Sequence, residues 1–360
     1  MPLFDLNPKE TPQELFGREK ELDEIVNLIK ARRWVAVLGP RMVGKTSLIK
    51  AANKKLENER IRTVYVNLWG ARGTQGLLNA LAHGLNSSIG LLKRIKDAAM
   101  RIEGVSFGPG GISISVSKKP MTTTWDLLTA IGHQAGNCVI EMDEVQELAV
   151  ISGHLLKLLA NVFNSYSNLV FVFTGSMFGI MKTLLDPGPS SPLYGRSPAR
   201  LYLRPFVKSK AEDFLMKGFK EYDIPVEKDL IQEAVERLDG IPGWLTLYGN
   251  SVSIRKIPHN KAMEETVSDG IKIVRDEIEH FLESRDRLAY LAALKAAATS
   301  ARWNEVKGAI EASKSSSVND ATVYNILENL KAAMLISDYD KVYRIDDPIL
   351  RAYLLTSQLA

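Results

Sequence analysis

The sequence predicts an α/β fold built on a parallel sheet, followed by a helical part and a small C-terminal domain. Short apolar runs alternate with segments of helical spacing in the first 206 of the 360 residues. Such runs are typical of strands buried on both faces of a parallel sheet. Their alternation with helices predicts a doubly wound arrangement. The expected strands are Trp34–Leu38, Thr63–Leu68, Cys138–Met142, Leu169–Phe173 and a last short one, Leu201–Leu203.

The expected helices follow from apolar residues that recur every three or four positions. Leu22, Ile25, Val26 and Ile29 show this spacing ahead of the first strand. Residues 1–16 are rich in Pro, Asn and Glu and are expected to form an arm of the α/β domain, which is expected to span 1–206. Further helices are expected over Thr46–Leu56, Leu77–Met100 with a break near Ser87–Gly90, Trp125–Gln134 and His154–Phe163.

A β-hairpin insertion is expected within residues 103–119. Apolar residues there alternate with serines and glycines on both sides of Gly108-Pro109-Gly110-Gly111. Period-two alternation around a Gly/Pro turn predicts two antiparallel strands. The insertion would project between two helices of the α/β domain.

The last 154 positions predict two further domains. Residues 207–283 have helical spacing with a turn at Asp239–Gly243 and are expected to form a helical domain. Residues 284–360 predict a winged helix, because three helical segments precede a short alternation that would form the wing around Asp338–Lys341. The second helix is expected over Trp303–Ala312 and the recognition helix over Asn319–Met334, with Val323, Ile326, Leu327 and Leu330 facing the core.

The expected recognition helix is poor in cations. It holds one lysine, Lys331, against the acids Asp320 and Glu328. A helix that reads DNA is expected to offer Arg or Lys to phosphates and base edges. The residues therefore leave two roles open for the winged helix, contact with DNA and docking of a protein or of another part of this chain.

Composition limits the function classes. Charged residues make up 24% of the chain and the formal net charge is +4, which is too small to establish nucleic-acid binding. A single cysteine, Cys138, excludes an intramolecular disulfide and is expected to be a small buried residue. No zinc-ligand spacing, signal peptide or long apolar span is recognised, so a cytoplasmic protein is expected.

A phosphate-binding loop is the most specific motif. Gly39-x-x-x-x-Gly44-Lys45-Thr46 follows an expected strand and opens an expected helix. Backbone N–H groups of such a loop and of the helix start converge on phosphates. Lys45 is expected to contact the β- and γ-phosphates as a catalytic residue, and Thr46 to bind Mg²⁺. The expected nucleotide-binding positions are Gly39, Pro40, Arg41, Met42, Val43, Gly44, Lys45, Thr46 and Ser47.

An acidic pair ends a later strand. Asp143 is expected to hold Mg²⁺, and Glu144 to polarise the attacking water as the catalytic base. Glu141 interrupts the apolar run and is expected at a polar edge of the strand. After the next strand, a hydroxyl of Thr174-Gly175-Ser176 is expected to bond the γ-phosphate or the water, with Ser176 assigned that catalytic role. Arg196 and Arg200 are candidates for phosphate contact or for solvent-exposed positions.

Together these motifs resemble the archaeal branch of the STAND/AAA+ ATPases over residues 14–290. Asp143-Glu144-x-Gln146 is similar to the family's Walker B ending, and Thr174-Gly175-Ser176 to its Gly-Ser sensor. The resemblance implies that Pro242, in Gly240-Ile241-Pro242, lies near adenine. It also implies that the box before the phosphate loop, Phe16-Gly17-Arg18-Glu19-x-Glu21-Leu22, lines the adenine pocket through Phe16, Gly17 and Arg18.

The same resemblance implies a strand order in which the Walker B strand is separated from the phosphate-loop strand. It makes residues 207–283 a helical lid, and relatives carry an insertion that matches 103–119. AAA+ proteins often have a lid arginine as a second sensor, and Gly240-Ile241-Pro242-Gly243-Trp244 has none. Arginine assistance from the lid and rapid unaided hydrolysis are therefore not expected.

The expected function is that of an ATP-driven switch. ATP or ADP with Mg²⁺ would bind, and the winged helix would signal the nucleotide state to a partner. The alternative is a DNA-binding ATPase related to origin-recognition or mobile-element proteins, and a third possibility is a nucleotide binder without turnover. No guanine-reading Asn-Lys-x-Asp follows the strands, which favours ATP over GTP. Oligomerisation is left open, because relatives by resemblance form rings or assemble conditionally.

Overall fold

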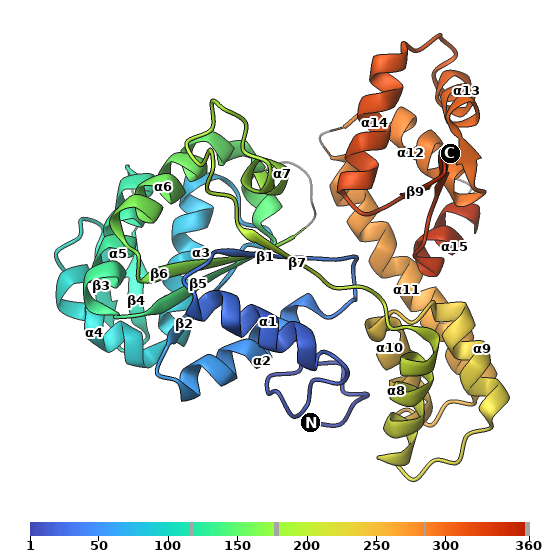
Figure 1. Ribbon diagram of the computed structural model, residues 1–360, viewed down its shortest axis with the longest axis horizontal. Coiled ribbons are helices and arrows are strands. Elements are labelled where there is room, and N and C mark those ends of the chain that lie inside the picture. The colour runs from blue at the N-terminus through green and yellow to red at the C-terminus, as the bar shows by residue number, and fades with distance from the viewer. Residues whose placement is uncertain (116–117, 176–179, 284, 357–360) are drawn as a thin grey trace. The chain divides into compact units, whose positions relative to one another are not determined.

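The computed structural model describes residues 1–115, 118–175, 180–283 and 285–356 (Figure 1). Its contacts divide the chain into two compact units. The first, here called the sheet unit, consists of Lys9–Gly39 and Lys45–Leu203. The second, here called the C-terminal unit, consists of Met1–Pro8, Pro40–Gly44 and Arg204–Ala360. The first eight residues thus belong to the C-terminal unit, whereas the sequence suggested that they are part of the α/β domain.

Five parallel strands form the core of the sheet unit, in the order β2-β5-β6-β1-β7. Strand β5 is separated from β1 by β6, as the family resemblance implied. The carboxyl ends of parallel strands lie along one edge, so the ends of β1, β5 and β6 meet there. The strands are β1 Val35–Leu38, β2 Arg62–Asn67, β5 Cys138–Asp143, β6 Leu169–Thr174 and β7 Ala199–Tyr202.

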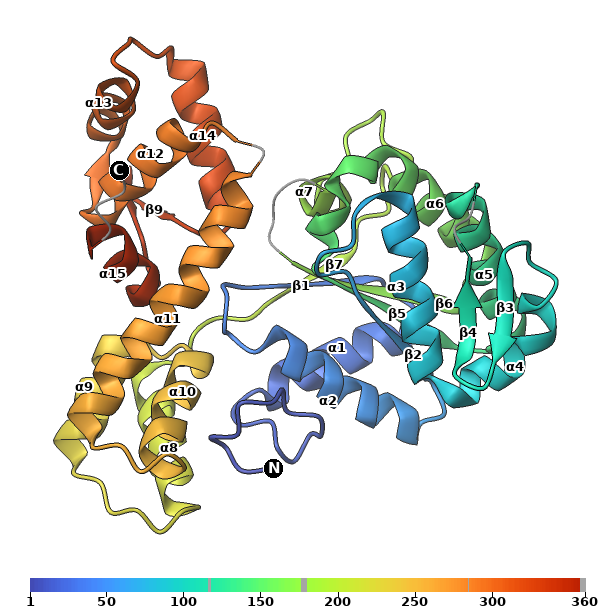
Figure 2. The same cartoon turned by 180° about the vertical axis from the view of Figure 1, so that it is seen from behind.

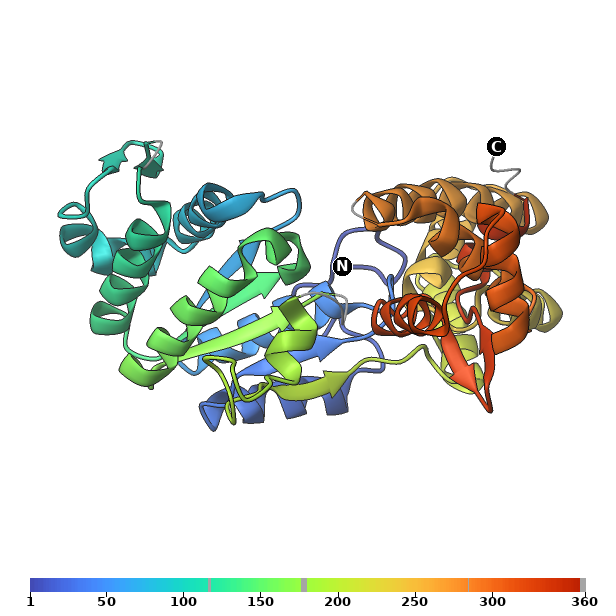
Figure 3. The same cartoon turned by 90° about the horizontal axis from the view of Figure 1, so that it is seen from above.

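Helices cover both faces of this sheet (Figures 2 and 3). Helices α1 and α2 lie on one face, and α3, α5 and α6 lie on the other. Side chains alternate along a strand, so Ile140 and Met142 of β5 face α3, α5 and α6, whereas Glu141 faces α2. The helices are α1 Glu19–Lys30, α2 Lys45–Asn58, α3 Gly73–Ser87, α4 Ile89–Ala99, α5 Pro120–Gln134, the 3₁₀-helix η1 Val145–Ile151, α6 Ser152–Ser165 and α7 Ile180–Leu185.

The predicted hairpin insertion is confirmed in its described part. Strand β3 (Val105–Gly108) pairs antiparallel with β4 (Gly111–Ile114). The side-chain amide of Asn86, from α3, bonds to both backbone polar groups of Ile112, as a residue of a neighbouring strand would. Its Oδ1 accepts from Ile112 N at 2.6 Å and its Nδ2 donates to Ile112 O at 2.9 Å.

The amino-terminal segment anchors in the C-terminal unit through Phe4. Its ring is fully buried and stands edge-on to Phe219, with centroids 5.0 Å apart. Gly218 and Gly249 make room for it, because a Cβ at either position would overlap the ring. Asn250 Nδ2 donates to the Phe4 carbonyl at 2.9 Å. The first part of the predicted arm is therefore bound to α8 (Lys208–Lys220) and α10 (Pro242–Ser253).

The rest of the helical lid consists of α9 (Lys228–Leu238) and the long helix α11 (His259–Leu282). The turn before α10 requires glycine. Gly240 has φ 65°, and a Cβ there would overlap the carbonyl oxygen of Phe206. The Gly240 carbonyl accepts from Phe206 N at 2.9 Å, which ties the start of the lid to this turn.

The winged helix follows α11, and its predicted core is confirmed. Val323, Ile326, Leu327 and Leu330 are buried on α14, whose first turn is capped by Asn319 accepting from Thr322 N at 2.8 Å. A three-stranded sheet of order β8-β10-β9 forms the wing. The elements are α12 Arg287–Ala298, β8 Ala301–Arg302, α13 Trp303–Lys314, α14 Asp320–Ala332, β9 Ser337–Tyr339, β10 Val342–Arg344 and α15 Pro348–Thr356.

Helix α15 was not predicted from the sequence. The Asp347 carboxylate starts it by accepting from Ile349 N at 2.8 Å and Leu350 N at 3.3 Å. Its Ile349 packs beside Gly270 of α11, where a Cβ would lie 2.9 Å from Ile349 Cγ2. The winged helix is thereby joined to the long lid helix over a packed surface within the C-terminal unit.

One stretch in the described part of the chain, Val145–Ser165, has the length and composition of a membrane span. Core helices of globular domains share these properties. Leu155, Leu158 and Leu159 of this stretch line the interior with Met142 and Phe171 of the sheet. It packs as a core element of the sheet unit.

Candidate functional site

Asp143 ends β5 at the carboxyl edge of the sheet, and two hydroxyl groups hold its carboxylate. Tyr65, from the neighbouring strand β2, donates to Oδ2. Thr174, from β6 on the other side, donates to Oδ1. Burial and then the negative charge of Asp143 raise the pKa of Tyr65 well above its ordinary value, so the phenol remains a proton donor. Asp143 is 7% exposed, and its carboxylate is fixed in orientation by these two hydroxyl groups.

Glu144 follows in a left-handed conformation with φ 59°. This reversal turns its side chain out of the strand, and its backbone N–H donates to Thr174 Oγ1 at 3.2 Å. The Glu144 carboxylate accepts a hydrogen bond from Gln146 Nε2. The predicted acids are thus adjacent, and Thr174 Oγ1 bonds to both residues. A hydrogen bond from this segment to the γ-phosphate or to the attacking water stays a prediction.

Gln146 is packed against Gly175. The buried Gln146 Oε1 has no hydrogen-bond partner among the residues described. A Cβ at Gly175, whose φ is 138°, would overlap that oxygen. Gly175 therefore leaves space for the amide that holds Glu144. Ser176, the hydroxyl predicted to be catalytic, lies outside the described residues.

The phosphate loop leaves β1 through Gly39 and enters α2 at Lys45. Gly39, Met42 and Gly44 have positive φ angles of 153°, 60° and 99°. Lys45 Nζ donates to the Gly39 carbonyl at 2.8 Å. The first turn of α2 has no acidic residue, and a Cβ at Gly44 would meet nothing within 4 Å. An uncrowded glycine, a lysine ammonium and a helix start without negative charge fit an anionic phosphate ligand.

The loop's tip belongs to the C-terminal unit. The Met42 carbonyl accepts from Gly243 N, in the first turn of α10, at 2.8 Å. A Cβ at Gly243 would lie 2.7 Å from Met42 Cβ. Arg41 Nη1 lies 2.8 Å from Glu277 Oε2 on α11. Residues predicted to contact phosphate are thus bonded to lid helices, next to Pro242 at the start of α10.

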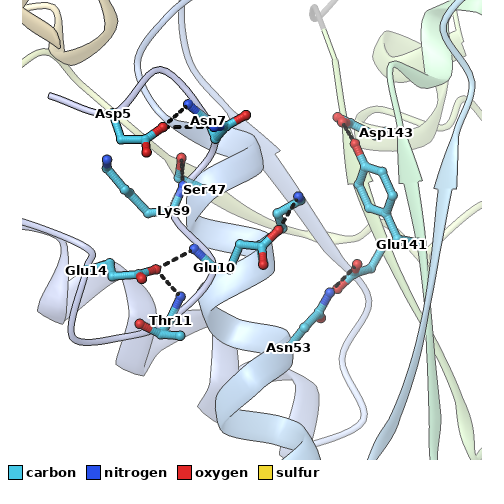
Figure 4. A network of polar contacts seen from close by, with 12 residues as sticks. Asp5, Asn7, Lys9, Glu10, Thr11, Glu14, Ser47, Asn53, Glu141 and Asp143 are labelled. Carbon is cyan, nitrogen blue, oxygen red and sulfur yellow. Dashed lines mark hydrogen bonds and ion pairs between the residues drawn. The ribbon is translucent and has the colours of Figure 1, made fainter. Parts of the chain in front are cut away.

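Phe16, Gly17, Arg18 and Ser47, which are also predicted to bind the nucleotide, lie in the sheet unit. Arg18 is buried and lies 3.0 Å from Glu21, and burial lowers the pKa of its guanidinium. Gly17 before it has φ 66°. The Ser47 hydroxyl accepts from Lys9 N at 3.1 Å, and Lys50 on the same helix pairs with Glu10 (Figure 4). Adenine contact by Phe16, Gly17 and Arg18 stays a prediction.

The expectation for Glu141 was wrong. Strand β5 lies inside the sheet between β2 and β6, so it has no polar edge, and Glu141 is 1% exposed. Its Oε2 accepts from Asn53 Nδ2 of α2 at 2.7 Å (Figure 4). Burial raises the pKa of Glu141 well above its ordinary range, although the Asn53 hydrogen bond acts in the opposite direction.

The candidate arginines each have a partner within the sheet unit. Arg200 pairs with Asp186 and donates to the Leu185 carbonyl. Arg196 places its guanidinium 5.4 Å from the centroid of the Phe163 ring. Their contact with phosphate stays a prediction.

Three residues of this site escaped sequence reasoning. Tyr65 and Asn53 lie on elements remote in sequence from the acids, and only the pairing of β2 with β5 and the docking of α2 bring them close. Gln146 was noted as part of a motif without a role. A phenol in the centre of the expected strand Thr63–Leu68 is the signal that would have identified Tyr65.

Comparison with known proteins agrees with this architecture. Residues 15–247 match the model of an ATPase domain predominantly from Archaea, and residues 268–345 match the C-terminal winged helix-turn-helix domain of MCM proteins. No curated protein matches the chain.

Solved structures show the same fold. The Walker-type ATPase paby2304 of Pyrococcus abyssi is 28% identical, with a TM-score of 0.77 over 98% of this chain and 99% of that one. The ORC2 protein of Aeropyrum pernix, solved in ADPNP–ADP complexes, is 14% identical, with a TM-score of 0.66 over 98% and 96%. The ORC1 protein of the same organism, solved with DNA, is 15% identical, with a TM-score of 0.52 over 98% and 96%.

The family model spans the box before the phosphate loop, the acid pair and most of the lid, which is well over half of the chain. The parallel sheet, the phosphate loop and the acids at the carboxyl edge of the sheet all lie within the matched residues. The chain belongs to the family of ATPase domains found predominantly in Archaea.

Proposed function

We propose that this protein binds ATP with Mg²⁺, hydrolyses it slowly, and signals the nucleotide state through its winged helix to a partner. The observation that carries the proposal is the fixed Asp143–Glu144 pair at the carboxyl edge of a sheet whose β1 leads into a phosphate loop. The family match and the nucleotide-bound ORC2 neighbour support nucleotide binding.

Each residue has a distinct role in this proposal. Lys45 and the loop amides hold the β- and γ-phosphates, and Thr46 and Asp143 hold Mg²⁺. The bound metal supplies positive charge that neutralises the phosphates. Glu144 accepts the proton of the attacking water, and Gln146 orients its carboxylate. Tyr65 and Thr174 orient Asp143 through its two oxygens.

The signal would pass through the phosphate loop itself. Met42 and Arg41 are bonded to α10 and α11, and α11 packs against α15 of the winged helix. A γ-phosphate held by the loop amides would change the balance of these contacts, and the winged helix would follow α11. Such a switch needs a differential affinity of the two states for ATP and ADP.

Phosphate release by the purified chain and by Glu144→Gln tests hydrolysis. We expect the variant to bind ATP with unchanged affinity and to release phosphate at least ~100-fold more slowly, as for loss of a general base. Lys45→Ala should abolish nucleotide binding. Equal background rates for wild type and Glu144→Gln would contradict hydrolysis by this site, and unchanged ATP affinity of Lys45→Ala would contradict the phosphate-loop assignment.

A second candidate function is DNA binding by the winged helix. The match to MCM winged helices and the ORC1 neighbour solved with DNA favour it. The charge pattern does not, because Lys331 pairs with Glu328 at 2.5 Å and Arg344 lies 3.1 Å from Asp346. A steep loss of duplex affinity with rising salt would support DNA contacts. Capture by Glu144→Gln with ATP, with both nucleic acid and protein identified, tests the protein-partner alternative.

A further inference from the structure

A buried polar pair joins the helix of the phosphate loop to the strand that ends in the acids. Asn53 Nδ2, on α2, lies 2.7 Å from Glu141 Oε2, on β5 (Figure 4). Glu141 is 1% exposed. The other buried side chains of α2 are apolar, and they are Leu48, Ile49, Ala51, Ala52 and Leu56. The Asn53–Glu141 hydrogen bond is therefore a directional contact made by a helix whose other buried side chains are apolar.

The pair is in register with the two residues assigned to Mg²⁺. Asn53 follows Thr46 by seven positions, or two helical turns of about 10.5 Å, and so lies on the same side of α2. Glu141 precedes Asp143 by two positions, or about 6.6 Å along the strand, and so faces the same side of the sheet. One hydrogen bond thus links the two elements just below both metal-binding positions.

Stability alone does not explain this pair. Burial of a carboxyl group against a single amide is unfavourable relative to an apolar pair of the same volume. Asn53 Oδ1 is also buried without a hydrogen-bond partner among the described residues. Leucine at both positions would avoid both penalties. What an apolar pair lacks is direction, because it permits α2 to slide or rotate on the sheet, whereas a hydrogen bond permits one arrangement.

We propose that Asn53 and Glu141 are positioning residues that hold Thr46 and Asp143 at the separation needed to share one Mg²⁺. The inference rests on the proposed ATP and magnesium site. Neither residue touches the nucleotide. Their contribution should therefore appear in the dependence on Mg²⁺ and not in metal-free nucleotide binding.

The test compares four full-length proteins with a fluorescent ATP analogue, in EDTA and across a Mg²⁺ titration. Asn53→Leu combined with Glu141→Leu replaces the pair by apolar groups. Glu141→Gln keeps the acceptor for Asn53 and offers Nε2 to Asn53 Oδ1. Lys54→Ala, an exposed change on the same helix, is the matched control.

We expect the double leucine variant to melt at or above the wild-type temperature and to bind the analogue equally well in EDTA. It should need at least ~10-fold more Mg²⁺ for the metal-dependent gain in affinity, the range found when support of a metal ligand is lost. Glu141→Gln and Lys54→Ala should stay within about threefold of wild type. Should the double variant fail to fold, Asn53→Ala replaces it, with the same shift expected.

The inference would be overturned if the leucine or alanine variant needed no more Mg²⁺ than the wild-type protein. It would also be overturned if Glu141→Gln raised the required Mg²⁺ concentration as much as the double leucine variant does. A wild-type protein whose ATP affinity ignores Mg²⁺ would instead contradict the proposed magnesium site. The two failures are therefore distinguishable in one experiment.

Discussion

Thr174 Oγ1 donates a hydrogen bond to Asp143 Oδ1 across the adjacent strands β6 and β5. The same oxygen accepts the backbone N–H of Glu144 at 3.2 Å. One fully buried hydroxyl thus fixes both the Asp143 carboxylate, which we assign to Mg²⁺, and the turn that directs Glu144, the proposed catalytic base. Because Thr174 ends β6, its hydroxyl lies within hydrogen-bond distance of both Asp143 and Glu144.

Replacement of this hydroxyl is expected to impair hydrolysis. Thr174→Val keeps the shape but removes the hydroxyl that bonds Asp143 Oδ1 and Glu144 N–H. We expect a ~10–100-fold lower rate of Mg²⁺-dependent phosphate release, as for lost support of a metal ligand. Thr174→Ser retains the hydroxyl and should keep most of the rate. Equal rates for the valine and serine variants would show that Thr174 serves only packing.

Gly175→Ala is expected to displace the amide that holds Glu144. A Cβ at this position would overlap Gln146 Oε1, and φ 138° is itself unfavourable for alanine. Phosphate release should fall, whereas ATP affinity should remain close to wild type, because Lys45 and the loop are untouched. Gln146→Ala should reproduce the loss of rate without backbone strain. The assignment fails if Gln146→Ala hydrolyses ATP at the wild-type rate.

Phe4→Ala is expected to destabilise the C-terminal unit by about 3–5 kcal/mol, the usual range for truncation of a buried aromatic ring. Urea unfolding followed by circular dichroism measures the change. Leu6→Ala is the matched control, because Leu6 is 59% exposed and should alter stability by no more than about 0.5 kcal/mol. Equal midpoints for the two variants would contradict the anchoring of Phe4.

Glu141→Gln is expected to raise stability increasingly with pH. Burial raises the pKa of Glu141 in the folded protein above its ordinary 4.5, so the folded state holds this proton more tightly than the unfolded state. The wild-type protein therefore loses stability from this group as pH rises above about 4.5. Glutamine does not titrate, and the difference in melting temperature should widen between pH 5 and 8. A constant difference would contradict the raised pKa.

The strands were accessible from the sequence because apolar runs, glycine turns and helical spacing are local signals. Their order in the sheet was implied only by the family resemblance. Lys45, Thr46, Asp143 and Glu144 were accessible because the loop and the acid pair follow strands whose carboxyl ends share one edge. The comparisons and the observed strand order confirm the fold. The nucleotide contacts of these residues stay predictions.

Contacts between residues that are far apart in the chain could not be predicted from the sequence. From the sequence, Glu141 was expected at a polar edge of its strand. The strand order places β5 inside the sheet, so the hydrogen-bond partner of Glu141 comes from helix α2. Phe4 reads as part of a polar arm, because nothing near it in sequence reveals the space left by Gly218 and Gly249. Helix α15 was not predicted because its first turn depends on a single capping side chain, Asp347. The strands of the wing come directly before it, so the sequence suggested that the domain ended with the wing.

The anchoring of Phe4 has a consequence for cleavage of the protein. The chain passes from one unit to the other at Pro8–Lys9, at both ends of the loop tip Pro40–Gly44, and at Leu203–Arg204. A protease nick after Leu203 would leave residues 1–203 still holding residues 204–360 by the Phe4 ring, by Asn250 and by Met42. The two fragments would co-elute as one particle, and removal of the Phe4 ring would weaken their association.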